Sequence, residues 1–288
     1  MVKVLSLFDG ISCGMVAFER AGIPVTEYHA CEIDKYAIQI SQKNYQQIVR
    51  HGSVVDYHPD RHFDYLIGGT PCQGFSFAGK QLAFNDPRSV LFFEYVRILK
   101  ECRVINPNIK FLLENVRMKN QHRQVITETL GVAPERINSA LVSAQNRVRD
   151  YWANWEITQP VDLKISGQDF QGIPTQNDYI LKNKILTSLG NGSLDRRGYY
   201  KGNSNSQRVY GLRKKLPTLL TNNTGGNNPL WITTDDKTAH RASIELCEWL
   251  QTLDVGYTAT APLDQRYKTI GNGWTVDIIS HILKCSVH

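Results

Sequence analysis

Short apolar runs alternate with amphipathic stretches through the first half of the chain. Val2 to Phe8 predicts a buried strand, and a glycine-containing turn then leads into a helix that ends near Arg20. Further strands are predicted at 27–31, 53–55, 63–67, 109–113, 137–142 and 150–155, and further helices at 35–45, 91–99 and 122–130. Strands that alternate with helices form a mainly parallel sheet, so the pattern predicts a doubly wound, Rossmann-like α/β fold.

The regular pattern ends near Glu156. Residues 156–240 hold many Asn, Gly, Ser and basic residues with little periodicity, and helical pattern returns only at 242–253 and 276–283. We therefore expect three parts. They are an α/β domain over 1–158, a small loop-rich domain over 159–240, and a hinge and C-terminal part over 241–288 that completes the first domain.

The net charge of +6 is concentrated in the irregular segment. Ten Lys and Arg stand against five acidic residues between Glu156 and Asn228. A basic excess confined to one segment suits a polyanionic partner, although a solvated surface is the commoner reason for any one such stretch.

Cysteine spacing and hydropathy exclude several classes of protein. The six Cys residues are scattered without the paired spacing of a zinc site or a disulfide framework. No apolar run approaches the length of a membrane span, and the first residues enter a strand directly. We expect a cytoplasmic protein with reduced thiols, no bound metal, no signal peptide and no membrane segment.

A thiol follows the strand predicted at 63–67. Two glycines and Thr70 lead into Pro71-Cys72-Gln73-Gly74, so Cys72 comes where open α/β sheets bind ligands. A Cys in a loop at this edge is a candidate nucleophile, although a lone Cys in a cytosolic protein is more often structural. The rest of the sequence reverses that preference.

A second candidate group follows the strand predicted at 27–31. Glu32 lies 22 residues beyond Gly10 of the first turn, about where nucleotide-binding folds place a carboxylate on ribose hydroxyls. A solvated acid at a strand end is an equally common reason for such a residue.

Five short motifs occur in one order along the chain. They are Phe8-Asp9-Gly10, Thr70-Pro71-Cys72-Gln73, Glu114-Asn115-Val116, Gln145-Asn146-Arg147-Val148-Arg149 and Gly271-Asn272-Gly273-Trp274. Together they resemble the DNA (cytosine-5) methyltransferases. Parts of the pattern are similar to de novo-type animal enzymes and parts to bacterial and phage enzymes. The resemblance covers Val4 to Trp155 and Pro217 to the C-terminus.

The resemblance implies catalytic roles for four side chains. The Cys72 thiolate is expected to add to C6 of cytosine and so to raise the electron density at C5. Glu114 is the expected acid at N3, and Arg149 the expected donor to O2 as negative charge develops. Arg147 is expected to order the loop that carries the nucleophile.

The resemblance also implies S-adenosyl-L-methionine as methyl donor, with S-adenosyl-L-homocysteine as product. Phe8 is expected on the adenine, Glu32 on the ribose, and Asn272 with Trp274 at the methionine end. Where the family often has Gly-Asp for the adenine amino group, this chain has Gly52-Ser53, so either Ser53 or Asp56 is expected there. The expected cofactor contacts are Phe8, Asp9, Gly10, Ile11, Ser12, Cys13, Glu32, Ile33, Ser53, Val54, Pro71, Leu91, Asn272, Gly273 and Trp274.

Double-stranded DNA is the implied partner. The target base is expected to rotate out of the duplex, with residues 74–88 closing over it and residues 159–240 serving as the target-recognition domain. A monomer or weak dimer of bacterial or phage origin, within a restriction-modification context, is expected. The expected DNA contacts are Gln73, Ser76, Lys80, Arg196, Arg197, Asn222 and Asn223.

Three other functions stay open at this point. An RNA (tRNA) cytosine-5 methyltransferase of the same fold would use the same Cys. A catalytically silent DNA-binding homologue would have no chemical need for Cys72, Glu114 and Arg149 together. A Cys hydrolase needs a His beside the thiol; no His lies nearby in the sequence, although His29 is a distant candidate.

Overall fold

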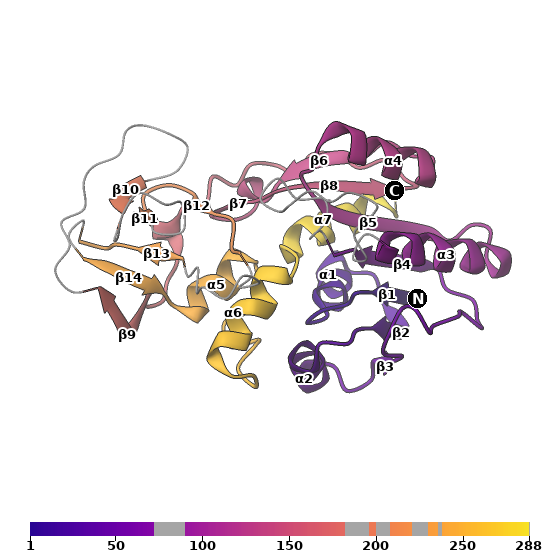
Figure 1. Cartoon of the computed structure of the whole chain (residues 1–288), viewed down its shortest axis with the longest axis horizontal. Helices are drawn as coiled ribbons and strands as arrows, with labels where there is room; N and C mark the ends of the chain where they lie inside the picture. The colour runs from indigo at the N-terminus through magenta and orange to yellow at the C-terminus, as the bar shows by residue number, and fades with distance from the viewer. Residues whose placement is uncertain (72–89, 182–195, 200–207, 221–229, 236–237, 288) are drawn as a thin grey trace. The chain divides into compact units, whose positions relative to one another are not determined.

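A computed structural model of the 288-residue chain describes most of its length (Figure 1). The described residues are 1–71, 90–181, 196–199, 208–220, 230–235 and 238–287, with the backbone alone described at 176–181 and 196–199. The chain divides into two compact units. The first comprises 1–137, 148–159 and 277–288, and the second comprises 138–147 and 160–276.

A seven-stranded sheet organises the first unit. Its order is β3-β2-β1-β4-β5-β8-β6, and the pairs from β3 to β5 are all parallel, whereas β8 runs antiparallel to β5. The strand order reverses between β1 and β4, which is the switch point of a doubly wound fold. The strands are β1 (Val2–Leu7), β2 (Val25–Cys31), β3 (Val49–Arg50), β4 (Tyr65–Gly69), β5 (Lys110–Val116), β6 (Glu135–Asn138) and β8 (Val148–Ala153).

Helices lie between these strands in the sequence, and α3 and α4 bury apolar side chains in one core with the sheet. The core includes Leu5, Leu66, Phe92, Tyr95 and Phe111, all at most 1% exposed. Local sequence sets the helix ends: the Asp34 carboxylate accepts the Tyr36 N–H at 2.9 Å and so caps α2. The helices are α1 (Cys13–Ala21), α2 (Lys35–Asn44), α3 (Val90–Ile105), α4 (Asn120–Leu130) and α7 (Val276–Cys285). Across the described parts of the chain, no helix has the length and apolar character needed to cross a bilayer.

The described residues of the second unit form short strands and two helices. Its five-stranded sheet has the order β10-β11-β13-β14-β9, and β7 pairs with β12 separately. The strands are β7 (Gln145–Asn146), β9 (Thr175–Leu181), β10 (Arg196–Tyr199), β11 (Arg208–Tyr210), β12 (Leu216–Pro217), β13 (Trp231–Ile232) and β14 (Ala239–Ala242). The helices are α5 (Ile244–Leu250) and α6 (Leu263–Asn272), with 3-10 turns at Ser139–Leu141 and Gly167–Asp169.

The predicted α/β class with a mainly parallel sheet is confirmed, but two elements differ from the prediction. The strand expected at 53–55 is β3, several residues earlier, because Val49 and Arg50 pair with β2 and Gly52 (φ +75°) then turns the chain away. The strand expected at 137–142 ends at Asn138, whose side chain accepts the Ala140 N–H and starts a 3-10 turn. The second unit also extends beyond the loop-rich segment expected at 159–240, because it includes α5 and α6.

Gly68 lies where β4 closely approaches β1 and the Tyr95 ring. It lies opposite Leu7 in the pairing of β1 with β4. A Cβ at this position would meet the Leu7 carbonyl oxygen at 2.9 Å and the Tyr95 ring at 3.1 Å. The Leu7 oxygen belongs to the backbone of β1, and the Tyr95 side chain is completely buried, so neither can easily move away.

We expect Gly68→Ala to lower the free energy of unfolding by about 1–3 kcal/mol, because the added methyl group overpacks the sheet. Urea unfolding followed by circular dichroism would measure the change. Lys43→Ala, at an exposed position on α2, is the control and should shift stability by less than about 0.5 kcal/mol. Equal stability of the Gly68 and Lys43 variants would show that this contact does not constrain the sheet.

Candidate active site

The turn between β1 and α1 has an unusual backbone. Phe8, Gly10 and Ser12 have φ angles of 58°, 60° and 62°, so left-handed conformations recur at every second residue. For non-glycine residues such conformations cost roughly 1–3 kcal/mol each and are concentrated at functional sites. Both Phe8 and Ser12 belong to the predicted cofactor-binding turn.

Glu32 fixes this turn to the end of β2. One carboxylate oxygen accepts the Gly10 N–H at 2.8 Å, and the other accepts the N–H groups of Ile33 and Asp34, both at 2.8 Å. The acid that the sequence singled out by its spacing from Gly10 therefore touches Gly10 directly. The space next to Gly10 is open, since an added Cβ would meet no atom within 4 Å.

Asp9 organises the inner side of the same turn. Its carboxylate accepts hydrogen bonds from the Tyr28 hydroxyl at 2.8 Å and from the Ser12 hydroxyl at 2.5 Å. Burial raises the pKa of Asp9, and the hydroxyl donors oppose that rise. Ser12 continues the chain of hydrogen bonds to the Ser41 hydroxyl at 2.6 Å, and Arg50 donates to Ser41 at 2.9 Å.

The loop after β3 holds the residues expected at the adenine. The Ser53 hydroxyl oxygen accepts the Val55 N–H at 3.1 Å, while Asp56 is exposed. Val54 is buried in the core of the first unit, so a contact through its backbone remains compatible with the prediction. Among the other expected cofactor contacts, Ile33 is 76% exposed and Leu91 packs partly buried against the same core.

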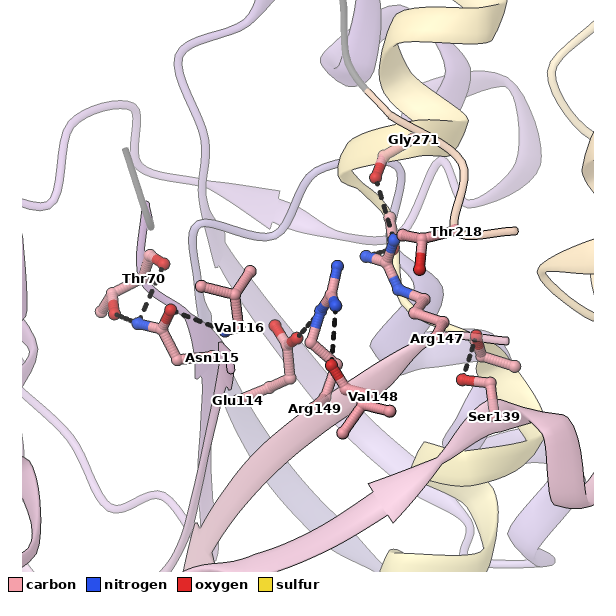
Figure 2. A network of polar contacts seen from close by, with 12 residues as sticks. Thr70, Glu114, Asn115, Val116, Ser139, Arg147, Val148, Arg149, Thr218 and Gly271 are labelled. Atoms are coloured by element: carbon pink, nitrogen blue, oxygen red, sulfur yellow. Dashed lines mark hydrogen bonds and ion pairs between the residues drawn. The ribbon is translucent and has the colours of Figure 1, made fainter. Parts of the chain in front are cut away.

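Residues at the carboxyl end of β5 contact the carboxyl end of β4 and the residue that follows it. Gly69 pairs with Glu114 in the parallel register of the two strands. The buried Asn115 side chain then donates to the Thr70 hydroxyl at 2.9 Å and accepts the Val116 N–H at 2.7 Å (Figure 2). This amide fixes Thr70, which precedes Pro71 and lies two positions before Cys72 in the sequence.

Glu114 and Arg149 form an ion pair (Figure 2). The Arg149 Nε lies 3.0 Å from a Glu114 carboxylate oxygen, and both side chains are at most 12% exposed. Arg149 also donates to the Val148 carbonyl at 2.8 Å. The antiparallel pairing of β5 with β8 brings these two motifs together, placing Val116 opposite Arg149. The sequence singled out both residues and allowed a nearby Arg as a partner of Glu114, but it did not identify Arg149 as that partner.

Arg147 belongs to the second unit and contacts the motif that ends α6. Its guanidinium donates to the Gly271 carbonyl at 3.4 Å and the Gly273 carbonyl at 2.9 Å. Its backbone N–H donates to the Asn138 side chain at 3.0 Å. Within the described residues, Arg147 therefore orders the Gly-Asn-Gly-Trp segment that contains Asn272 and Trp274.

Sequence reasoning missed the buried amide network beside Arg147. Gln251 donates to the carbonyls of Ile270 at 2.9 Å and Gly273 at 3.1 Å. Its amide oxygen accepts from Gln145 at 3.1 Å and from the Thr275 hydroxyl at 2.9 Å. Gln145 and Gln251 are both completely buried, and Gln145 also accepts the Leu219 N–H at 2.9 Å. A buried Gln pair has no periodic signal in one sequence, so only the motif around Gln145 pointed here.

His29, the distant candidate for a Cys hydrolase, hydrogen-bonds to the ring of His51. Its ring lies 2% exposed between Phe63 and His51, with a hydrogen bond of 2.8 Å to the His51 ring. Burial and the neighbouring His51 lower the pKa of His29. Among the described residues, no group of three or more His, Cys, Asp or Glu side chains could hold a metal ion.

Several predicted residues lie outside the described part of the chain. They include the expected nucleophile and the expected covering loop, 74–88. The backbones of Arg196 and Arg197 lie in β10, but their side chains are not described. The predicted residues outside the description are Cys72, Gln73, Ser76, Lys80, Asn222 and Asn223.

Residues 2–139 match the family model of C-5 cytosine-specific DNA methylases. The chain is 36% identical over 206 residues to the Type II methyltransferase M.HgiCI of Herpetosiphon aurantiacus, covering 65% of this chain and 48% of that protein. It is 38% identical over 162 residues to the Type II methyltransferase M1.ScrFI of Lactococcus lactis subsp. cremoris, covering 52% and 40%. The chain thus spans less than half the length of these relatives, and the resemblance expected from the motifs is confirmed.

A solved structure supports the fold independently. The crystal structure of the S. pombe Dnmt2 methyltransferase superposes with a TM-score of 0.72, covering 99% of this chain and 98% of that one at 15% identity. At this identity the likeness concerns the fold alone.

We expect Gln251→Leu to lower the free energy of unfolding by about 3 kcal/mol, because it removes the four hydrogen bonds of a completely buried amide, to Ile270, Gly273, Gln145 and Thr275. Chemical unfolding would measure the loss. Gln42→Leu, on the exposed face of α2, is the matched control and should change stability by less than about 0.5 kcal/mol. A Gln251 variant as stable as this control would contradict the structural role of the network.

Proposed function

Because residues 2–139 carry the C-5 cytosine-specific DNA methylase match, we propose that this chain transfers a methyl group from S-adenosyl-L-methionine to C5 of cytosine in double-stranded DNA. The observation that supports this most directly is the buried Glu114–Arg149 ion pair. It lies at the carboxyl edge of the sheet, next to the strand that leads into Pro71-Cys72. An acid and a guanidinium at this edge suit a pyrimidine ring whose N3 and O2 become more basic during reaction.

The proposed reaction begins with addition of the Cys72 thiolate to C6 of the base. The C5–C6 double bond supplies the electrons for a new bond from C5 to the methyl carbon of the sulfonium donor, which leaves as a neutral thioether. A base then removes the C5 proton, the C5–C6 double bond re-forms, and the Cys72 thiolate departs. The thiolate is regenerated, and the covalent route divides one difficult step into easier ones.

Glu114 and Arg149 act on the opposite side of the pyrimidine. Glu114 hydrogen-bonds or protonates N3 as the thiolate adds, and Arg149 donates to O2 as negative charge spreads there. Their ion pair supports these roles because it holds both groups in one orientation before the base arrives. The acid is therefore preorganised rather than recruited from solvent.

The residues of the first turn fit an adenosyl cofactor. The Glu32 carboxylate lies beside open space at Gly10, and carboxylates there suit ribose hydroxyls. When bound, the cofactor supplies the electrophilic methyl group. The turn 8–13 would surround its methionine part, and Ile33, Ser53, Val54 and Leu91 its adenine. Pro71, Asn272, Gly273 and Trp274 complete the proposed contact set.

The DNA would be recognised by residues 159–240. A stacked cytosine does not expose C6 to a thiol, so the base must leave the helix before addition. Residues 74–88 are the proposed cover over the flipped base. Basic side chains of the recognition segment, among them Arg196 and Arg197, would contact phosphates, and Asn222 and Asn223 would read base edges.

We expect Cys72→Ala to abolish methylation while leaving S-adenosyl-L-homocysteine binding within about twofold of the wild type, because the thiol takes part in chemistry and not in cofactor binding. Bisulfite sequencing of DNA from cells that express each variant would report both activity and target sequence. Isothermal titration of the purified chains would report cofactor binding.

Cys285→Ala, a half-buried thiol on α7, is the matched control and should keep wild-type methylation. Methylation that survives in the Cys72 variant would refute the covalent route. Methylation of tRNA but not of duplex DNA by the wild-type chain would reassign the substrate to RNA.

A further inference from the structure

Arg97, in the middle of α3, donates hydrogen bonds from its guanidinium group to two carboxylates and two backbone carbonyls. The side chain is only 28% exposed. Its partners lie on α3 itself and on the loop after β3. Nε donates to Glu94 at 2.8 Å, Nη1 to Glu101 at 2.9 Å, and Nη2 to the carbonyls of Val54 at 2.9 Å and Tyr57 at 3.0 Å. His58 Nδ1 lies 3.0 Å from a Glu101 carboxylate oxygen and 3.1 Å from Nη1.

The two carbonyl contacts are the unusual part of this arrangement. The chain leaves β3 at Gly52 with a left-handed φ of +75° and forms no regular strand through residues 53–57. Buried carbonyls in such a loop need donors from elsewhere. Nη2 of Arg97 bridges both carbonyls from one side, and so it fixes the loop at two points to a helix of the core.

The two acids on α3 hold the guanidinium in place for this task. Glu94 and Glu101 lie one turn before and after Arg97, and the pair Arg97–Glu101 has the i,i+4 spacing. Burial alone would raise the pKa of Glu101, but hydrogen bonds from Arg97 and His58 bring it below the ordinary value. Glu101 is therefore ionised at neutral pH, and its contact and that of Glu94 orient the planar fork of Arg97 toward the loop.

We propose that Arg97 is a positioning residue for the cofactor: by bridging the Val54 and Tyr57 carbonyls it fixes the segment 53–56 against which the adenine binds. This inference rests on the proposed function, because that function places the adenine beside Ser53 and Val54. Arg97 itself does not touch the cofactor. It acts through the backbone of the segment that contains Ser53 and Asp56, the two alternative contacts for the adenine amino group.

The variant Arg97→Lys tests the two carbonyl hydrogen bonds separately from the positive charge. A lysine keeps a positive charge near Glu94 and Glu101, but one ammonium cannot replace the planar fork that reaches two carbonyls at once. We expect the dissociation constant for S-adenosyl-L-homocysteine to rise about tenfold or more, because two charge-assisted hydrogen bonds to the loop are lost. The maximal rate at saturating cofactor should change much less than the KM for S-adenosyl-L-methionine.

Arg136→Lys is the matched control. Arg136 also loses a two-point contact in this variant, since it donates to both oxygens of the buried Asp150 at 2.7 and 3.0 Å, but it does not touch residues 53–58. The cofactor affinity of Arg136→Lys should stay within about twofold of the wild type, while its loss of thermal stability should be similar to that of Arg97→Lys. Hydrogen exchange provides a second readout: amides at 53–58 should exchange faster in Arg97→Lys and not in Arg136→Lys.

Each outcome of this comparison decides the inference. Unchanged affinity in Arg97→Lys, or equal weakening in Arg136→Lys, would overturn the positioning role while leaving the proposed function intact. A wild-type chain that binds no S-adenosyl-L-homocysteine would instead overturn the proposed function, and the role of Arg97 with it. A selective rise in dissociation constant with faster exchange at 53–58 is the supporting result.

Discussion

The parallel register of β1, β4 and β5 is the constraint on which the first unit depends. Leu7 lies opposite Gly68, and Gly69 lies opposite Glu114, so the carboxyl ends of the three strands meet at one edge. The register is fixed by close packing, because Gly68 leaves no room for a side chain between the Leu7 carbonyl and the Tyr95 ring. A shift by one residue would reverse the facing of every side chain in β4.

Polar side chains at that edge hold backbone in place before any ligand binds. Glu32 closes the first turn through the Gly10 N–H, and Asn115 fixes Thr70. Arg97 does the same for the loop after β3 through two carbonyls. The second unit repeats the principle with Arg147 and Gln251 around Gly273. Preorganisation of this kind spares a site the cost of ordering loops during binding.

The sequence predicted the parts of this structure that depend on local pattern. The strand, turn and helix at the N-terminus and the position of Glu32 beside Gly10 follow from spacing within a few dozen residues. Contacts between distant residues were not predictable in this way. Gln145 and Gln251 are 106 positions apart, and Arg97 meets Val54 across 43. A single sequence has no periodic or compositional signal for such pairs. The strand predicted at 53–55 was wrong. Val54 and Val55 are good strand formers, but Val49 and Arg50 are the residues that pair with β2.

Covalent trapping tests the central claim, that the Cys72 sulfur adds to C6 of cytosine. Fluorine at C5 cannot leave as the proton does, so an adduct that has accepted a methyl group should persist. A pool of random-sequence duplexes containing 5-fluorocytosine, incubated with the wild-type chain and S-adenosyl-L-methionine, should yield a denaturation-resistant protein–DNA complex whose peptide map places the bond at Cys72. Cys72→Ala should form none. A wild-type chain that methylates ordinary DNA but leaves the fluorinated pool untrapped, or a bond mapped to another residue, would contradict the account.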